Sequence, residues 1–129
     1  QFIKTDGSGN LSFASAGATL NHSDLADATT TVASSATSTL NTFDKTVYRS
    51  AKYFISIKDA TNSRFEIVEA NVTHDGSDAY VSTFGSTTNY TGGLCVFSAD
   101  VSGDDVRLRI TNISDASTVF KFQRIAVDV

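Results

Sequence analysis

The stretch KYFISIKDATNSRFEIVEANVTHDGSDAYVSTF, residues 52–84, decides the fold class of this chain. In its first segment, residues 52–58, the apolar side chains of Tyr53, Ile55 and Ile57 occupy every second position. Alternation with a period of two is typical of a β-strand that buries one of its faces. The segment therefore predicts a strand with these three side chains directed into a core.

Two turn signals divide the remainder of the stretch into further strands. Residues 59–63 read Asp-Ala-Thr-Asn-Ser, and Asp75-Gly76-Ser77 is the strongest hairpin signal in the chain. Between them, residues 64–74 predict a long strand whose apolar face switches near Glu69, which indicates a bulge or bend there. Residues 79–84 then return as the next strand. We expect consecutive antiparallel hairpins.

The same pattern continues through the rest of the chain from about residue 39. Val106, Leu108 and Ile110 alternate with polar neighbours, and residues 94–99 are almost entirely apolar, which predicts a buried strand. In total, seven or eight strands follow one another at spacings of about ten residues, without helical periodicity. We predict an all-β fold, an antiparallel β-sandwich of jelly-roll-like type.

The first part of the chain has a different composition. Residues 1–38 are rich in Ser, Thr, Ala and Gly, and the sequence FIKTDGSGNLSF at residues 2–13 predicts a hairpin around a turn of Asp, Gly, Ser and Asn. Residues 22–28 (HSDLADA) could form one helical turn, residues 29–32 are more typical of a short strand, and residues 34–38 indicate a linker or an edge. We predict two regions, an N-terminal hairpin with a Ser/Thr-rich linker used in assembly (1–38) and the β-sandwich domain (39–129).

Charge, hydropathy and cysteine content exclude several classes of partner. The net charge of −4 without a Lys/Arg cluster argues against binding to nucleic acid, and no apolar run approaches the length needed for membrane insertion. Cys95 is the only cysteine, and its apolar surroundings predict a small buried side chain. Because the chain starts at Gln1 without a methionine, we expect a fragment or a processed product.

Motifs for catalysis, cofactors or metals are not recognisable in the sequence. His22 and His74 lie far apart, and the only glutamates, Glu66 and Glu69, should face opposite sides of one strand unless a bulge intervenes. The acidic residues around Gly103 are interpreted as an ordinary turn. We therefore predict no catalytic residues, no metal, no cofactor, and a protein that is not an enzyme.

One segment is a candidate for surface contact. Tyr80, Phe84 and Tyr90 cluster around a Ser/Thr/Gly-rich loop, residues 82–93. Exposed tyrosines beside small polar residues make adaptable contact surfaces. The alternative is that these aromatic side chains only cover the core.

Three stretches resemble a known family. They are FIKTDGSGNLSFAS, AKYFISIKDATNSRFEIVEANVTHDGSDAYVSTFGS and DVSGDDVRLRITNISDASTVFKFQRIAV. Their sequences resemble tail-fibre and other virion structural proteins of tailed bacteriophages, especially those of marine cyanobacteria. The resemblance implies a β-sandwich on a fibre or capsid-attached appendage of the virion, usually a homotrimer, with no enzymatic activity required.

The resemblance also suggests what the N-terminal hairpin packs against. A single two-stranded hairpin is barely stable in water, so we expect Phe2, Ile3, Leu11 and Phe13 to be buried against equivalent residues of neighbouring protomers. The expected function is assembly, with contact to other virion proteins and to a host cell-surface glycan or protein. The alternative is a carbohydrate-binding module of a larger surface or secreted protein, although such modules often use Trp, which this chain lacks.

Overall fold

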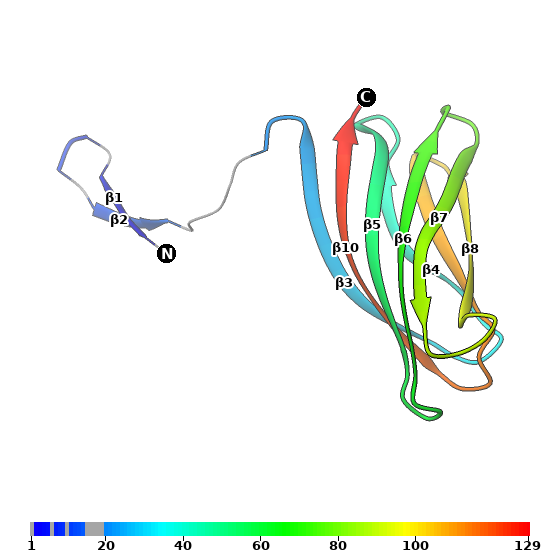
Figure 1. Cartoon of the computed structure of the whole chain (residues 1–129). Helices are drawn as coiled ribbons and strands as arrows, with labels where there is room; N and C mark the ends of the chain where they lie inside the picture. The colour runs from blue at the N-terminus through cyan, green and yellow to red at the C-terminus, as the bar shows by residue number, and fades with distance from the viewer. Residues whose placement is uncertain (1, 6, 10, 15–19) are drawn as a thin grey trace.

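The computed structural model describes residues 2–5, 7–9, 11–14 and 20–129, and within these ranges it contains strands but no helix (Figure 1). The all-β prediction is therefore confirmed. In chain order the strands are β1 (Phe2–Thr5), β2 (Leu11–Ala14), β3 (Ser23–Val32), β4 (Thr37–Asp44), β5 (Tyr48–Asp59), β6 (Arg64–His74), β7 (Ala79–Thr88), β8 (Cys95–Ser102), β9 (Asp105–Asn112) and β10 (Thr118–Asp128).

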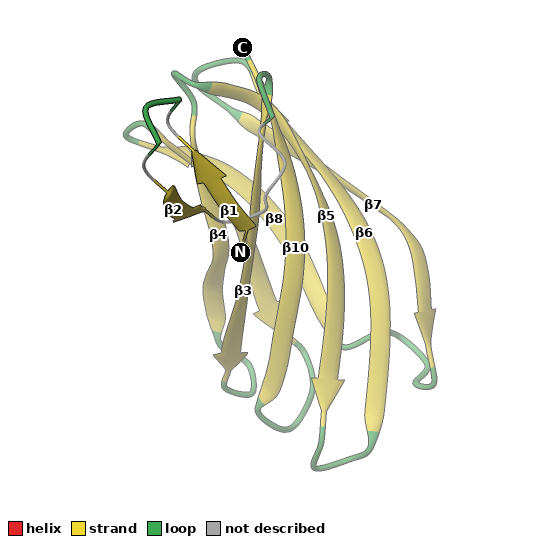
Figure 2. Cartoon of the chain, turned by 90° about the vertical axis from the view of Figure 1, so that its left-hand side faces the viewer, coloured by secondary structure: helices red, strands yellow, loops and turns green. Residues whose placement is uncertain are grey.

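Two antiparallel sheets pack face to face and form the predicted sandwich (Figure 2). One sheet has five strands in the order β3-β10-β5-β6-β7, and the other has three in the order β4-β9-β8. The hairpins predicted around residues 59–63 and 75–77 are confirmed, since β5 pairs with β6 and β6 with β7 in antiparallel register. The chain changes sheet between β3 and β4, β4 and β5, β7 and β8, and β9 and β10.

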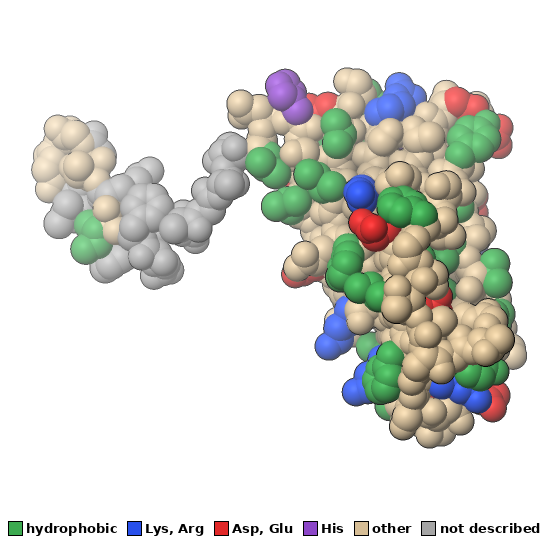
Figure 3. Space-filling view, viewed as in Figure 1, with side chains coloured by type: hydrophobic (Ala, Val, Ile, Leu, Met, Phe, Trp, Pro, Cys, Tyr) green, Lys and Arg blue, Asp and Glu red, His purple; other side chains and the backbone are tan. Residues whose placement is uncertain are grey.

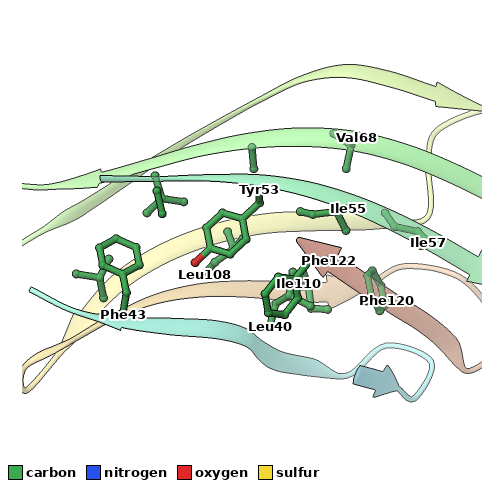
Figure 4. Packing of buried hydrophobic residues seen from close by; sticks show 14 of the residues in the cluster. Leu40, Phe43, Tyr53, Ile55, Ile57, Val68, Leu108, Ile110, Phe120 and Phe122 are labelled. Atoms are coloured by element: carbon green, nitrogen blue, oxygen red, sulfur yellow. The ribbon is translucent and has the colours of Figure 1, made fainter. Parts of the chain in front are cut away.

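The core lies between the two sheets, where the alternating residues meet (Figure 4). Tyr53 and Ile55 on β5 are 0% exposed, and Leu108 and Ile110 on β9 are also 0% exposed. The predicted inward faces of residues 52–58 and 106–111 are therefore correct. The Tyr53 hydroxyl donates a hydrogen bond of 2.8 Å to Asn41 Oδ1, so the ring reaches from one sheet to the other without losing a partner for its polar end.

Strand β6 keeps one inward face along its whole length. Val68, Ala70 and Val72 are buried, whereas Phe65 and Ile67 point outward. The predicted switch of the apolar face near Glu69 is therefore wrong, but a register shift does occur there, between Ile67 and Glu69. The extra residue lies in the partner strand β7, where Gly85 has φ +67°.

The prediction of a linker before residue 39 is wrong, and the short strand expected at 29–32 is only the second part of a strand at residues 23–32. These residues form β3, which pairs with β10 along its full length, so the possible helical turn at 22–28 does not form either. β3 is rich in Ala and Thr and is held by its pairing with β10. The sandwich thus begins at Ser23, and the boundary expected at residue 38 falls inside β4.

Strand β8 also differs from its prediction as a fully buried strand. Leu94, which precedes it, is 0% exposed, but Val96 is 55% exposed. Alternate residues of β8, among them Val96, point away from the five-stranded sheet, so this face of the strand lies toward solvent.

The predicted N-terminal hairpin is present as a separate two-stranded sheet. Strands β1 and β2 pair from Phe2↔Ala14 to Thr5↔Leu11, and they lie apart from the sandwich in Figure 1. Ile3 is 61% exposed. The side chains of Phe2, Leu11 and Phe13 lie outside the described part of the chain, so the interface predicted for these residues remains a prediction.

Polar groups tie the loops at one end of the sandwich together. The Asn112 side chain is fully buried and donates hydrogen bonds of 2.9 Å to the backbone carbonyls of Val32 and Ala116, while its Oδ1 accepts one from the Ser114 amide. Asp59, also buried, accepts hydrogen bonds from Asn62 and Ser114, which lower the pKa of its carboxyl group. These contacts join the loops after β3, β5 and β9.

Candidate contact surface

The outward faces of the two sheets differ in chemical character. On the three-stranded sheet, Arg107 donates two hydrogen bonds of 2.6 Å to the Asp100 carboxylate, and Arg109 lies 4.0 Å from the same group. The Arg107 guanidinium therefore lowers the pKa of Asp100. Next to them, the hydroxyl groups of Thr37 and Thr111 are hydrogen-bonded at 2.8 Å. This face is mostly polar, and its two arginines lie against the Asp100 carboxylate.

The outward face of the five-stranded sheet is rich in large apolar side chains, and every strand contributes. Figure 3 shows hydrophobic side chains gathered on this side of the sandwich, with charged groups between them. Eight such residues are 36–65% exposed, and we refer to them as the outer apolar face: Leu25, Phe54, Phe65, Ile67, Tyr80, Phe84, Ile125 and Val127. Exposed apolar surface concentrated on one face marks a site of interaction.

The centre of this face holds a charged pair between aromatic rings. The strand register aligns Phe54, Glu69 and Phe84 across β5, β6 and β7. Lys52 Nζ lies 3.4 Å from Glu69 Oε1 and 5.3 Å from the centre of the Phe84 ring, where a cation–π attraction adds to the ion pair. The centre of the face therefore offers aromatic rings for stacking next to charged groups for polar contacts.

A shallow depression of about 470 Å³ adjoins the pair. Residues on β5, β6, β7 and β10 line it, among them Lys52, Asn71, Tyr80, Ser82 and Ile125. Its base is the sheet itself, so the backbone that positions these side chains is held by pairing on both sides of β5 and β6. The depression is open to solvent and could accept a protruding side chain or a sugar ring.

Two of the three contact residues predicted from the sequence lie on the same outward face. Tyr80 and Phe84 lie on β7, not in a loop, and both face outward. The Tyr80 hydroxyl donates a hydrogen bond of 2.9 Å to Asp75 Oδ2. Tyr90 lies in the loop after β7, where the Arg64 guanidinium sits 3.9 Å from its ring centre. The part these three residues play in contact remains a prediction.

The sequence reasoning missed most of the outer apolar face. The alternation places Phe54 on the face opposite Tyr53, whereas Phe65 and Ile67 were predicted to belong to an apolar face that switches near Glu69. Nothing indicated that the outward side would be left without a covering layer. Leu25 lay in a region interpreted as a helical turn or a linker. The available signal was that β5 and β6 carry large apolar residues on both faces, which is unusual for a sheet with one solvated side.

The groups most capable of chemistry are dispersed. Glu66 points inward and accepts hydrogen bonds from the Leu94 amide (2.8 Å) and Ser86 Oγ (2.9 Å), whereas Glu69 points outward, as their odd spacing predicted. Burial, and then the nearby Glu66 carboxylate, raise the pKa of the Cys95 thiol to about 12. Among the described residues, no group of three potential metal ligands comes together, and no helix is long and apolar enough to cross a membrane.

Fold and surface together describe a β-sandwich module with a candidate contact face. No family model and no curated protein matches the chain. Among solved structures, it is similar to the tailspike protein of Acinetobacter baumannii phage AM24 (13% identity, TM-score 0.49, 81% of this chain and 26% of that chain). It is also similar to the gp49 tailspike of A. baumannii phage Fri1 (18%, 0.41, 83% and 18%) and the tailspike of Acinetobacter phage vB_ApiP_P1 (16%, 0.43, 91% and 24%).

All three identities are below 20% and all three TM-scores are below 0.5, so these similarities assign no role to this chain. The chain spans about a quarter or less of the length of the tailspikes it matches. The expected relation to phages of marine cyanobacteria is not supported, since all three tailspikes come from Acinetobacter phages.

The prediction that the protein is not an enzyme is contradicted. The Fri1 tailspike is described as a capsular polysaccharide depolymerase. The lack of a recognisable catalytic motif in the sequence is therefore no ground for excluding enzymatic activity, and that exclusion is withdrawn.

Proposed function

We propose that this chain is a structural module of a phage tail appendage in the virion, and that its outer apolar face docks onto a neighbouring protein of the appendage. The observation that carries the proposal is the asymmetry between the sheets: eight exposed large apolar side chains lie on the outward face of one sheet. The other sheet presents arginine–aspartate pairs. The sequence resemblance to tail-fibre proteins supplies the class of assembly, a homotrimer carried on a fibre.

The energetics favour a covered face. Fully burying one large apolar side chain contributes about 1.5–3 kcal/mol, and these eight are roughly half exposed. Covering them would contribute on the order of 6–12 kcal/mol before the costs of association. Charged residues at outward positions among them would orient the contact and fix its register. They are Lys52, Lys58, Lys121 and Asp27.

Immunogold labelling of purified particles tests the assignment. Antibodies raised against the chain should label the tail appendage of the phage that encodes it. Particles that carry no label, or carry it on the capsid shell, would refute a tail-appendage module.

A second candidate function is carbohydrate binding, by the chain itself, at the centre of the same face. Phe54 and Phe84 offer aromatic surfaces for stacking, and Lys52, Glu69 and Asn71 offer donors and acceptors for sugar hydroxyl groups beside a depression of about 470 Å³. Calorimetric titration with host capsular polysaccharide tests it. Binding that disappears in Phe84→Ala and Asn71→Ala, but persists in Val96→Ala on the other sheet, would favour this function.

A further inference from the structure

Strand β3 forms an open edge of the five-stranded sheet. Within the described chain it pairs on one side only, with β10, from Ser23↔Val127 to Val32↔Thr118 without a register shift. A strand at the end of a sheet leaves a row of backbone N–H and C=O groups without sheet partners. The backbone groups along one side of this ten-residue strand are therefore open to a further strand.

Most of the features that normally protect an edge are missing from β3. It contains no Pro, Lys or Arg and no bulge. Of its two charges, Asp24 is engaged by Arg124, which leaves Asp27. The other edge strands differ: β4 and β7 each contain a register shift, and β8 packs beside β7.

The five-stranded sheet also extends beyond the smaller sheet at β3. Ala28 is opposite the buried Phe122 in the register, yet Ala28 is exposed, and Ala26 is only half-buried. No layer therefore covers the inner side of β3 at Ala28. An added strand would therefore find neither face of the sheet covered at this edge.

The same chain contains a strand pair that lacks a third strand. Hairpin β1–β2 forms a sheet of its own and does not pair with β3 of its own chain. A two-stranded hairpin is marginal in water, and a third strand is the usual source of stability. The edge of β3 and the edges of the hairpin both present backbone N–H and C=O groups without sheet partners, so they can pair with each other.

We propose that the β1–β2 hairpin of one copy adds to the β3 edge of a second copy and extends its five-stranded sheet to seven strands. Main-chain hydrogen bonds would supply the affinity, as in other strand additions. Such a contact joins two different surfaces, so its repetition gives a ring where the rotation closes and a filament where it does not. It uses the edge of the sheet, whereas the proposed function uses its outer apolar face, and each can fail without the other.

Charged substitutions at the edge test the proposal on the full chain. The variant Ala28→Lys/Thr31→Lys places two cations on exposed positions of β3. Its control, Val96→Lys/Ser102→Lys, adds the same charge at exposed positions of β8. In native mass spectrometry the unmodified chain and the control should be oligomers and the edge variant a monomer. An edge variant that keeps the oligomer mass, or an unmodified chain that is monomeric at every concentration, would overturn the proposal.

Hydrogen exchange of the unmodified chain provides a second test that needs no variant. As concentration rises, amides in residues 2–5 and 11–14 should become protected together with those of 23–32. Protection of 23–32 alone would indicate that two β3 edges pair with each other, and protection independent of concentration would indicate pairing within one chain. Either result contradicts addition of a partner's hairpin.

Discussion

At the scale of single residues, Asp75 shows how one side chain fixes a turn. Its carboxylate accepts hydrogen bonds from the amides of Asp78 (2.8 Å) and Ser77 (2.9 Å) and from the Tyr80 hydroxyl. The Asp78 amide, then the Ser77 amide and the Tyr80 hydroxyl, lower the pKa of Asp75 to about 2. The sequence predicted the Asp-Gly turn at this point, but not the link from the turn to Tyr80, because a tyrosine's hydroxyl partner depends on where the next strand returns.

This lowered pKa predicts a pH-dependent contribution to stability. In the unfolded chain an Asp has a pKa of about 3.9, so the ionised Asp75 stabilises the fold above about pH 4, and this stabilisation is lost as pH falls toward 2. Urea unfolding of Asp75→Asn should show a deficit at pH 6 that disappears near pH 2. Asp104→Asn in the β8–β9 turn is the control. A deficit that is constant from pH 6 to 2 would show that the charge of the Asp75 carboxylate does not stabilise the turn.

A second residue-scale prediction concerns Asn112. Replacing it with Ala leaves the carbonyls of Val32 and Ala116 and the Ser114 amide without their partner in a buried site. The free energy of unfolding should fall by about 3 kcal/mol. Asn89→Ala removes hydrogen bonds to Phe65 N and Ser63 O at an exposed site, where water replaces them, and should cost about 1 kcal/mol or less. Equal losses in chemical denaturation would contradict this difference.

At the scale of elements, the β7 bulge depends on Gly85. Its φ of +67° lies in the left-handed region, which a Cβ disfavours. Gly85→Ala should therefore lower the free energy of unfolding by about 1–2 kcal/mol. Gly85→Asn should lose less, because asparagine tolerates this conformation. Thermal denaturation of both variants checks the order, and an alanine variant as stable as the original chain would refute the backbone argument.

The strands that the sequence predicted in full and the strand that it predicted only in part differ in burial. β5 and β9 are central strands with one face in the core. Their apolar residues therefore alternate cleanly, and both strands can be recognised in the sequence. β3 is an edge strand that extends past the smaller sheet. Its inner face therefore carries small residues such as Ala26 and Ala28 instead of the large apolar residues that mark a core strand. β3 pairs with β10, whose residues lie about a hundred positions away in the chain, so the local sequence pattern does not indicate this pairing.

At the scale of the whole molecule, the sandwich could be predicted, but its asymmetry could not. Phe54 was expected to point away from Tyr53 and its neighbours, and it does. Whether such residues face solvent or a second layer depends on how many strands each sheet contains and on which side the other sheet packs. That information resides in the topology, so the contact face was found only once the five- and three-stranded sheets were placed.

Substitutions on the outer apolar face should separate folding from assembly. Phe54 and Phe84 are 49% and 38% exposed, so Phe54→Ser/Phe84→Ser should reduce the free energy of unfolding by only about 1–2 kcal/mol. The same variant should be depleted from particles in immunoblots, because the lost side chains belong to the proposed contact. Val96→Ser on the other sheet is the control. Normal incorporation of the double variant would argue against contact through this face.

The most direct test of the outer apolar face as a contact surface is hydroxyl-radical footprinting of the isolated chain and of the same chain within purified particles. The side chains of Phe54, Tyr80 and Phe84 serve as probes, because all three are exposed in the single chain. We predict strong oxidation of these rings in the isolated protein and marked protection in the particle. Equal oxidation in both states would show that the face remains open after assembly and would contradict the proposed function.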